Sequence, residues 1–396
     1  APGRPGVQFY FPVNVMDKGK IILLSLAHMC SDINGGAIPA LLPFLVVAFG
    51  YSYTDAAVIM FGYACVASLV QPFFGWLSDK WSCFWFIPAA ILTMGCAMGA
   101  MGFVSSYWGI WICACLCGMG SSLFHPEAAR YTNYLSGHSK GAGMSLFSIG
   151  GNTGFILGPI IIGFLTPLFG LKSTLFFTVL GVCTAFSFLY SFAHMPPVTK
   201  KKLAVKRAQG KNDWHAFAWL TGVVVSRAVV FQGFYSFTAL YWMKYYGASA
   251  STGSYMLALF AVVGVISNMT GGILSDRVGY VRILRITQLC LFPAVALFVA
   301  AGNPWLSAAL LIPVSFCIYA SYSPMVILGQ TYLARNLGFS AGITLGVSRS
   351  AGGIALPLVG LIADHWGLNA ALLCLLVPVA VGIVSACMLP QKEPQE

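Results

Sequence analysis

Charged residues are scarce in this chain of 396 residues. It has 21 basic and 10 acidic residues, which together make up 8% of the chain, while apolar residues make up 58%. A soluble domain carries roughly 25% charged residues, and so few charges would leave large apolar patches in contact with water. The composition therefore excludes an ordinary soluble protein and predicts that lipid surrounds most of the chain.

The sequence also lacks motifs of common catalytic and ATP-driven proteins. It contains no His-Glu-x-x-His and no Walker loop, which disfavours a metalloprotease and an ATP-driven pump. Its twelve Cys are too few for a disulfide scaffold, and Cys113, Cys115 and Cys117 point to different sides of a helix. His125-Pro-Glu127 resembles a zinc-deaminase motif, but no Pro-Cys-x-x-Cys follows it. We therefore predict no enzyme activity, no cofactor and no metal site.

Apolar segments long enough to cross a bilayer recur along the chain, and each crossing takes about 20 residues. We place twelve of them at 21–49, 55–77, 84–104, 107–130, 141–168, 171–193, 214–246, 253–274, 281–301, 304–333, 339–363 and 368–389. Prolines inside them, such as Pro43 and Pro159, are tolerated in membrane helices. The sequence predicts an all-α membrane protein with twelve transmembrane helices.

The basic residues gather on one side of this arrangement. If the segments alternate in direction, 17 of the 21 Lys and Arg fall on one face, Lys172 and Lys244 fall on the other, and Arg227 and Arg349 fall within helices. Cytoplasmic loops of membrane proteins carry such an excess of Lys and Arg. We predict that both termini are cytoplasmic in a bacterial inner membrane.

The longest connection, at 194–213, contains six Lys and Arg between 200 and 211. Its basic run could bind nucleic acid, but an anchor that touches anionic lipid is favoured. We predict an N-terminal six-helix bundle at 1–193, a cytoplasmic basic linker at 194–213 and a C-terminal six-helix bundle at 214–396.

The two halves share landmarks at a nearly constant offset. Gly75-Trp-Leu-Ser-Asp79-Lys80 matches Gly272-Ile-Leu-Ser-Asp276-Arg277 at an offset of 197 residues. The pairs Pro126 and Pro324, Pro159 and Pro357, and Gly163 and Gly360 repeat that offset within one residue. This indicates a duplicated six-helix unit, and parallel repeats of this kind place the substrate path between the halves, near the bilayer midplane.

These motifs carry a resemblance. The paired Gly-x-Leu-Ser-Asp-Lys/Arg loops resemble the signature loop of the major facilitator superfamily, and Gly154-x-x-x-Gly158-Pro159 resembles a motif of its drug:proton antiporters, with Ile162 in place of one glycine. His28-x-x-x-Asp32, Ser121-Ser-Leu-Phe-His125-Pro-Glu127-Ala-Ala-Arg130 and Gly150-Gly-Asn152 are similar to the fosmidomycin-resistance group of bacterial efflux proteins. The resemblance implies two pseudo-symmetric six-helix bundles and proton-coupled drug efflux.

Asp32 lies near the middle of the first segment, with His28 one turn away on the same face. A charge inside a membrane helix costs at least about 2.5–3.5 kcal/mol, so such a residue indicates function. We predict that Asp32 couples protons and that His28 is its hydrogen-bonding neighbour. The alternative is a buried pair that only fastens the first segment to the fourth.

The fourth segment carries His125, Glu127 and Arg130 around Pro126, which bends a helix. Glu127 and Arg130 can pair at a spacing of three, which would keep Glu127 ionised until substrate or a proton competes. We predict that all three polar residues contribute to proton coupling. The alternative is a gate or a salt bridge at a helix end near the cytoplasmic surface.

Arg227 and Arg349 are each about ten to thirteen residues from a cytoplasmic end and therefore near the midplane. No acidic residue lies within the apolar segments of the C-terminal half to neutralise them, since Asp276 lies at a loop and Asp364 at the outer end of a segment. We predict that both arginines bind a small anion through paired N–H groups. Permanent ion pairs between the halves are the alternative.

Two further groups complete the predicted site. Polar and aromatic side chains that we expect to line the cavity are Asn152, Gln232, Tyr235, Tyr241, Tyr319, Tyr322 and Gln330. The resemblance implies that gating residues are Asp79, Lys80, Asp276, Arg277, Gly154, Gly158 and Pro159, with charge pairs that break as the halves rock.

The sequence thus predicts a monomeric secondary transporter that exports a small anionic drug or metabolite, such as a phosphonate or carboxylate, in exchange for protons. Its partners would be this solute, protons and membrane lipid, and no nucleic acid. A proton-coupled importer is the alternative within the same fold, and a membrane receptor or enzyme is less favoured.

Overall fold

The computed structural model describes residues 16–80, 85–192, 212–336, 339–340 and 342–390, and in these ranges the chain is helical with short connections. Nine helical stretches of the described ranges are long and apolar enough to cross a membrane. Two of them, Lys140–Ser191 and Ser350–Cys387, each contain two predicted segments, and the shorter apolar helix Phe86–Ala100 accounts for another. The predicted all-α fold with twelve spans is confirmed.

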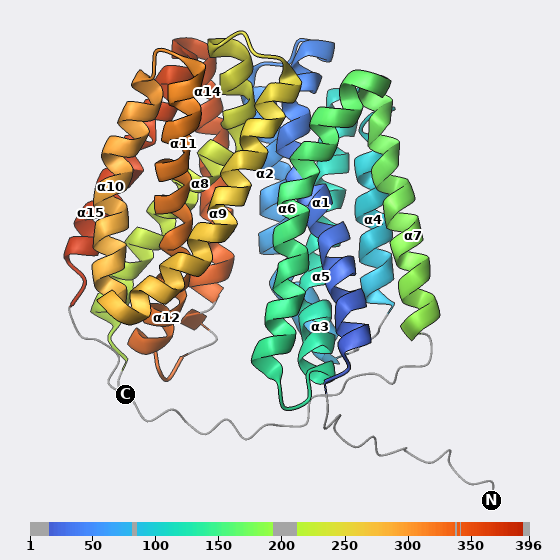
Figure 1. The fold of residues 1–396 in the computed structure, drawn as a ribbon, viewed down its shortest axis with the longest axis horizontal. Coiled ribbons are helices and arrows are strands. Elements are labelled where there is room, and N and C mark those ends of the chain that lie inside the picture. Colours follow the sequence, from blue (N-terminus) through green and yellow to red (C-terminus); the bar gives the residue numbers. More distant parts are fainter. Residues whose placement is uncertain (1–15, 81–84, 193–211, 337–338, 341, 391–396) are drawn as a thin grey trace, which may run out of the picture.

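The helices form two groups that stand side by side (Figure 1). The first group contains α1 (Lys18–Phe49), α2 (Tyr53–Leu69), α3 (Gln71–Lys80), α4 (Phe86–Ala100), α5 (Tyr107–Leu135), α6 (Lys140–Phe169), η1 (Gly170–Thr174) and α7 (Leu175–Phe192). The second contains α8 (Trp214–Tyr245), α9 (Ala250–Val278), α10 (Tyr280–Ala300), α11 (Pro304–Ala320), α12 (Tyr322–Tyr332), η2 (Gly342–Val347), α14 (Ser348–Cys374) and α15 (Leu376–Cys387). Most of the predicted linker, 194–211, lies outside the described residues.

We call the end of the molecule where α1 begins and α15 ends the base, and the opposite end the tip (Figure 1). At the tip, α1 ends at Gly50, whose φ of 68° suits glycine, and the Gly50 N–H donates to Val46 O. Two residues later Ser52, the N-cap of α2, forms a capping box with Asp55. Two capping signals therefore fix the turn between these helices.

Glycines allow α1 and α6 to pack with their backbones in contact, inside the first bundle. A Cβ at Gly154 would lie 2.5 Å from Met29 O, and one at Gly158 would lie 2.5 Å from Ile33 O. Pro159 is buried at the same contact, 3.3 Å from the position that a Cβ on Gly36 would take. These residues therefore join two helices of one bundle, and their predicted role in gating stays a prediction.

The apolar core is shared at one end of the molecule and divided at the other. One cluster of buried side chains includes residues of both bundles, among them Ile33, Leu41, Val230 and Phe234. Two other clusters each belong to one bundle only and lie toward the base: one contains Ile21, Leu24 and Phe124, and the other contains Leu220, Val224 and Leu328. Apolar packing thus joins the bundles toward the tip and holds each bundle together separately toward the base.

Direct contacts between helices of the two bundles also lie in the shared region. Helix α2 packs on α14, α6 on α9, and α1 on α8. Tyr235 in α8 donates to Gly35 O at 3.3 Å, and Ser254 in α9 donates to Ala40 O at 3.1 Å. Further from the tip, the hydroxyls of Ser68 in α2 and Ser350 in α14 lie 2.7 Å apart.

The contact between α1 and α6 predicts the effect of adding one methyl group to it. Gly158→Ala should lower the free energy of unfolding by roughly 1–3 kcal/mol, because the new Cβ meets backbone that cannot move aside without shifting a helix. Thermal unfolding of the purified protein, followed by helical circular dichroism, measures this. Gly141→Ala is the matched control in the same helix, since its Cβ would meet nothing within 4 Å. Equal stability of the two variants would contradict the packing described.

Candidate functional site

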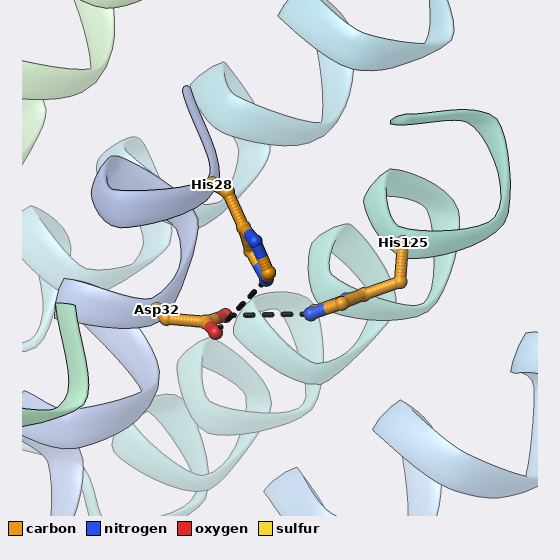
Figure 2. Close-up of side chains that lie close together, drawn as sticks. All are labelled: His28, Asp32 and His125. Carbon is orange, nitrogen blue, oxygen red and sulfur yellow. Dashed lines mark ion pairs between the residues drawn. The ribbon is translucent and has the colours of Figure 1, made fainter. Parts of the chain in front are cut away.

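Three side chains from two helices meet inside the first bundle. The Asp32 carboxylate lies between two imidazole rings, with Oδ2 at 3.2 Å from His28 Nε2 and Oδ1 at 3.4 Å from His125 Nε2 (Figure 2). Asp32 is 5% exposed, so it sits in an environment where an unpaired carboxylate is costly. The predicted His28–Asp32 pair is confirmed, and His125 of α5 joins it.

Both rings are oriented through their other nitrogen. His28 Nδ1 lies 2.9 Å from Phe147 O, and His125 Nδ1 lies 2.7 Å from Ser121 O. A backbone carbonyl only accepts a hydrogen bond, so each Nδ1 carries the proton that it donates. A neutral ring then turns the lone pair of Nε2 toward the carboxylate. Each His–Asp contact therefore becomes a hydrogen bond only when it holds an additional proton, and the cluster offers places for two.

Helix α6 closes one side of this cluster. The His28 ring stacks on Phe147 with centroids 4.1 Å apart. A Cβ at Gly151 would lie 2.5 Å from His28 Nε2 and 2.7 Å from Asp32 Oδ2. The side chains of His28 and Asp32 thus lie against the backbone of α6 at Gly151, and only glycine at this position leaves room for them.

The nitrogen and oxygen atoms of this cluster are also of the kind that bind metal ions, although the sequence predicts no metal site. One nitrogen or oxygen from each of His28, Asp32 and His125 lies within 4.8 Å of the others, a separation that a small cation could also bridge. The absence of a metal site stays a prediction, and experiments on this cluster need a metal chelator.

A second polar contact lies on α5, toward the base. Arg130 donates to the Glu127 carboxylate and to Ser78 O near the end of α3, and Glu127 is fully buried. The predicted pairing at a spacing of three is confirmed. Arg130 therefore ties α5 to the segment that contains the first signature loop.

The second bundle contributes an arginine surrounded by aromatic rings. Arg227 in α8 is 7% exposed, and its Nε donates to Ile318 O at 2.7 Å. Its guanidinium carbon lies 4.9 Å from the ring centre of Tyr322 and 5.5 Å from that of Phe231. Tyr319 packs edge-on against the Phe231 ring. A guanidinium beside aromatic rings is attracted to their π-faces, and it keeps its charge when buried.

Other residues predicted for the substrate site are spread more widely. Tyr235 joins Phe231 by ring stacking and reaches α1 at Gly35, whereas Gln232 is buried where α8 meets α14. Tyr241 packs with aromatic residues near the tip, about 21 Å along α8 from Arg227. Asn152 is half-buried and Gln330 is exposed near the base. The structure thus gathers Tyr235, Tyr319 and Tyr322 near Arg227, and separates Tyr241 and Gln330 from it.

The predicted charged gating residues are only partly described. Asp276 accepts a hydrogen bond from the Tyr280 hydroxyl at 2.6 Å, and both Asp276 and Arg277 are exposed. The backbones of Asp79, Lys80 and Arg349 belong to α3 and α14, but their side chains lie outside the described part of the chain. Their predicted roles stay predictions.

Three residues that the structure brings into these sites were missed by the sequence reasoning. Phe231 could have been found, since it lies one turn from both Arg227 and Tyr235 on the same face of a helix. Gly151 occurs in a motif that carried the resemblance, but only the packing reveals its contact with the cluster. The carbonyl of Phe147 has no sequence signal, because every residue has one.

Comparisons with known proteins agree with this architecture. The family model described as Major Facilitator Superfamily matches residues 24–356. The chain is 26% identical to the MFS-type transporter YfnC of Bacillus subtilis, over 98% of this chain and 95% of that protein. It is 25% identical to the fosmidomycin resistance protein of Escherichia coli, over 86% of each. A solved structure of a bacterial homologue of the human lysosomal transporter Spinster, described as inward-facing and occupied, has the same fold, with a TM-score of 0.81 and 14% identity over 94% of this chain and 96% of that one.

The close contact of Gly151 with the cluster generates a prediction. Gly151→Ala should leave the helices folded, because its Cβ meets the ends of side chains rather than backbone, but it should displace His28 and Asp32. Nitrogen NMR signals of labelled histidine rings, assigned with single His→Asn variants, should shift for His28 and His125. Gly141→Ala should leave both signals in place. Unchanged ring signals in Gly151→Ala would show that the cluster does not lie against α6.

Proposed function

The chain belongs to the Major Facilitator Superfamily, and from this membership we propose that it exports a small anion in exchange for protons by alternating access. Relatives named for drug resistance support efflux. The observation that carries the proton part is the Asp32 carboxylate held between two histidines whose Nδ1 atoms already donate to backbone carbonyls.

Protons bind at the His28–Asp32–His125 cluster in this proposal. With neutral rings and an ionised carboxylate, two acceptor nitrogens face the two acceptor oxygens of Asp32 in a site of low polarity, which is unfavourable. Taking up a proton replaces a repulsive contact by a charge-assisted hydrogen bond. The Glu127–Arg130 pair, two residues further along α5, responds to the same movement of α5 and completes the predicted coupling set.

The anion binds at Arg227, and Arg349 contributes a second cation from α14. Arg227 is supported by its burial and by the rings of Phe231 and Tyr322, both of which lie within cation–π distance of its guanidinium. A planar guanidinium matches a carboxylate or phosphonate through two parallel N–H bonds. The fosmidomycin resistance protein of Escherichia coli is a similar protein, and a phosphonate is a suitable first substrate to test.

The proton site and the anion site lie at the same level of the fold. Asp32 lies between Cys30, which belongs to the core of the first bundle alone, and Ile33, which belongs to the shared core. Arg227 lies between Val224 of the second bundle's core and Val230 of the shared core. Both charges therefore flank the level at which the bundles separate, where a bound proton or anion can favour one conformation over the other.

The base faces the cytoplasm in this proposal, because the basic residues of the chain gather there. The protein is a monomer in the bacterial inner membrane, with both termini in the cytoplasm and the bundles divided by the linker at 194–213. A proton-coupled importer would use the same two sites, so the direction of flux has to be measured.

The proposed role of Asp32 predicts the effect of removing its charge on proton coupling. In inverted vesicles with an interior-acid gradient, adding a phosphonate should cause proton release that a pH-sensitive dye records. Asp32→Asn should reduce this release to the level of vesicles without the protein, because a neutral amide has no charge to hold a proton between itself and either ring. All buffers contain a metal chelator, which removes cations that could occupy the cluster.

Asp17→Asn is the matched control, since it makes the same chemical change at the exposed start of α1, where Asn caps a helix as well as Asp does. Coupled release that persists in Asp32→Asn would remove this residue from the mechanism. Release driven only by lipophilic cations would contradict an anionic substrate. Anion movement out of the vesicles together with protons would identify an importer.

The proposed role of Arg227 predicts how substitutions there change the affinity for the anion. Arg227→Lys keeps the charge but loses the planar fork, and should raise the half-saturating phosphonate concentration by about 10- to 100-fold, as expected for one charge-assisted hydrogen bond. Arg227→Ala and Arg349→Ala should lower uptake further. Arg335→Lys, at an exposed position near the base, is the control. Normal affinity in all three variants would exclude the two-arginine site.

A further inference from the structure

One carboxylate joins the two bundles at the tip. Asp364 in α14 accepts hydrogen bonds from the backbone N–H groups of Tyr53 and Thr54 at 2.7 and 2.9 Å, and from the Thr54 hydroxyl at 2.5 Å. Tyr53 and Thr54 are the first residues of α2 in the other bundle. We propose that Asp364 is the polar latch that keeps the tip closed, and that the tip opens when α2 leaves this carboxylate.

The start of α2 is complete only when the bundles meet. The first N–H groups of any helix lack partners within it and carry a partial positive charge. The Ser52 hydroxyl, in the first bundle, accepts a hydrogen bond from the N–H of Asp55. The N–H groups of Tyr53 and Thr54 donate instead to Asp364 of the second bundle. Separating the bundles at the tip therefore removes a negatively charged cap from a helix terminus.

Close packing continues from this contact along the same face of α14. Gly360, one turn from Asp364, leaves no room for a side chain: a Cβ there would lie 2.8 Å from Ala57 Cβ and 2.9 Å from Tyr53 O. Two turns further, a Cβ at Gly353 would lie 3.0 Å from Ala64 Cβ. These contacts hold α14 against α2 in the register that brings Asp364 to the helix start.

The pseudo-symmetric junction, between α6 and α9, has no equivalent carboxylate among the described residues. At the repeat offset of 197, Asp364 corresponds to Pro167, and Tyr53 and Thr54 correspond to Ala250 and Ser251. Pro167 has no side-chain acceptor, and it lines a cavity of about 380 Å³ together with Ala250 and Ser251. Gly163, the counterpart of Gly360, packs against Tyr255 and Ser254. Within the described part of the chain, the charged contact thus occurs at the α2–α14 junction and not at the α6–α9 junction.

Hydrogen–deuterium exchange of the full-length protein in lipid nanodiscs tests this latch. Asp364→Ala should raise the exchange rate about tenfold in the first turns of α2 and also in the first turns of α9, whose junction with α6 does not touch Asp364. Asp364→Asn, which retains an acceptor but not the charge, should give a smaller rise. His365→Ala changes the neighbouring exposed side chain and should leave both regions unchanged.

Faster exchange confined to α2 would overturn the proposal, since it would make Asp364 a local cap with no influence on the other junction. Unchanged exchange at both junctions would overturn it as well. The measurement uses neither a substrate nor a proton gradient, so its outcome is independent of the transport activity proposed above. Loss of proton coupling in Asp32→Asn, or its persistence, leaves the latch unaffected.

Discussion

The two bundles are held together by an apolar core that they share toward the tip and that divides into two toward the base. In lipid, neighbouring helices gain little from burying apolar surface, so contact depends on close packing and on polar groups that find partners. The division leaves each bundle with a complete core of its own. Each can therefore move as a unit about the shared region, which a transporter that alternates its access requires.

The buried charged residues Asp32 and Arg227 lie close to the level at which the shared core divides. Asp32 and Arg227 lie at corresponding depths of α1 and α8, one in each bundle, between residues of the separate cores and residues of the shared core. Neither could occur deep within a close-packed apolar core without a partner. Asp32 meets two histidines, and Arg227 meets a carbonyl and two aromatic rings. The glycines of α6 make the first arrangement possible, because they let α1 approach until the His28–Asp32 pair contacts bare backbone.

Much of this could be predicted from the sequence where the interaction is local. The twelve spans follow from apolar run lengths, and the pairs His28–Asp32 and Glu127–Arg130 follow from helical spacings of four and three. The meeting of His125 with Asp32 could not be predicted, because it depends on how α1 and α5 are rotated about their axes, which no spacing within one helix encodes. The sequence predicts that Tyr241 lines the same cavity as Arg227, and both belong to one apolar segment. The two residues are 14 positions apart along the helix, which places Tyr241 near the tip instead. Asp364 looked like an ordinary residue at the end of a segment, since its partners lie more than 300 positions away.

The difference between the two junctions at the tip also has a consequence for how the bundles separate. Gly163 and Gly360 keep the two junctions similar in packing, but Asp364 gives the α2–α14 junction hydrogen bonds that water can replace, because Asp364 is exposed and Tyr53 and Thr54 are only half-buried. A hydrogen bond to a charged group contributes about 1.5–3 kcal/mol even after exchange with water, against about 0.5–1.5 kcal/mol for a bond between neutral groups. On the other side, the buried hydroxyl of Ser254 in α9 donates to Ala40 O of α1 and also to Ala250 O of its own helix, so it keeps an acceptor when the bundles separate. Opening the α2–α14 junction therefore breaks a charge-assisted contact that the α6–α9 junction lacks among the described residues, so the two junctions share a fold but differ in what has to break for them to open.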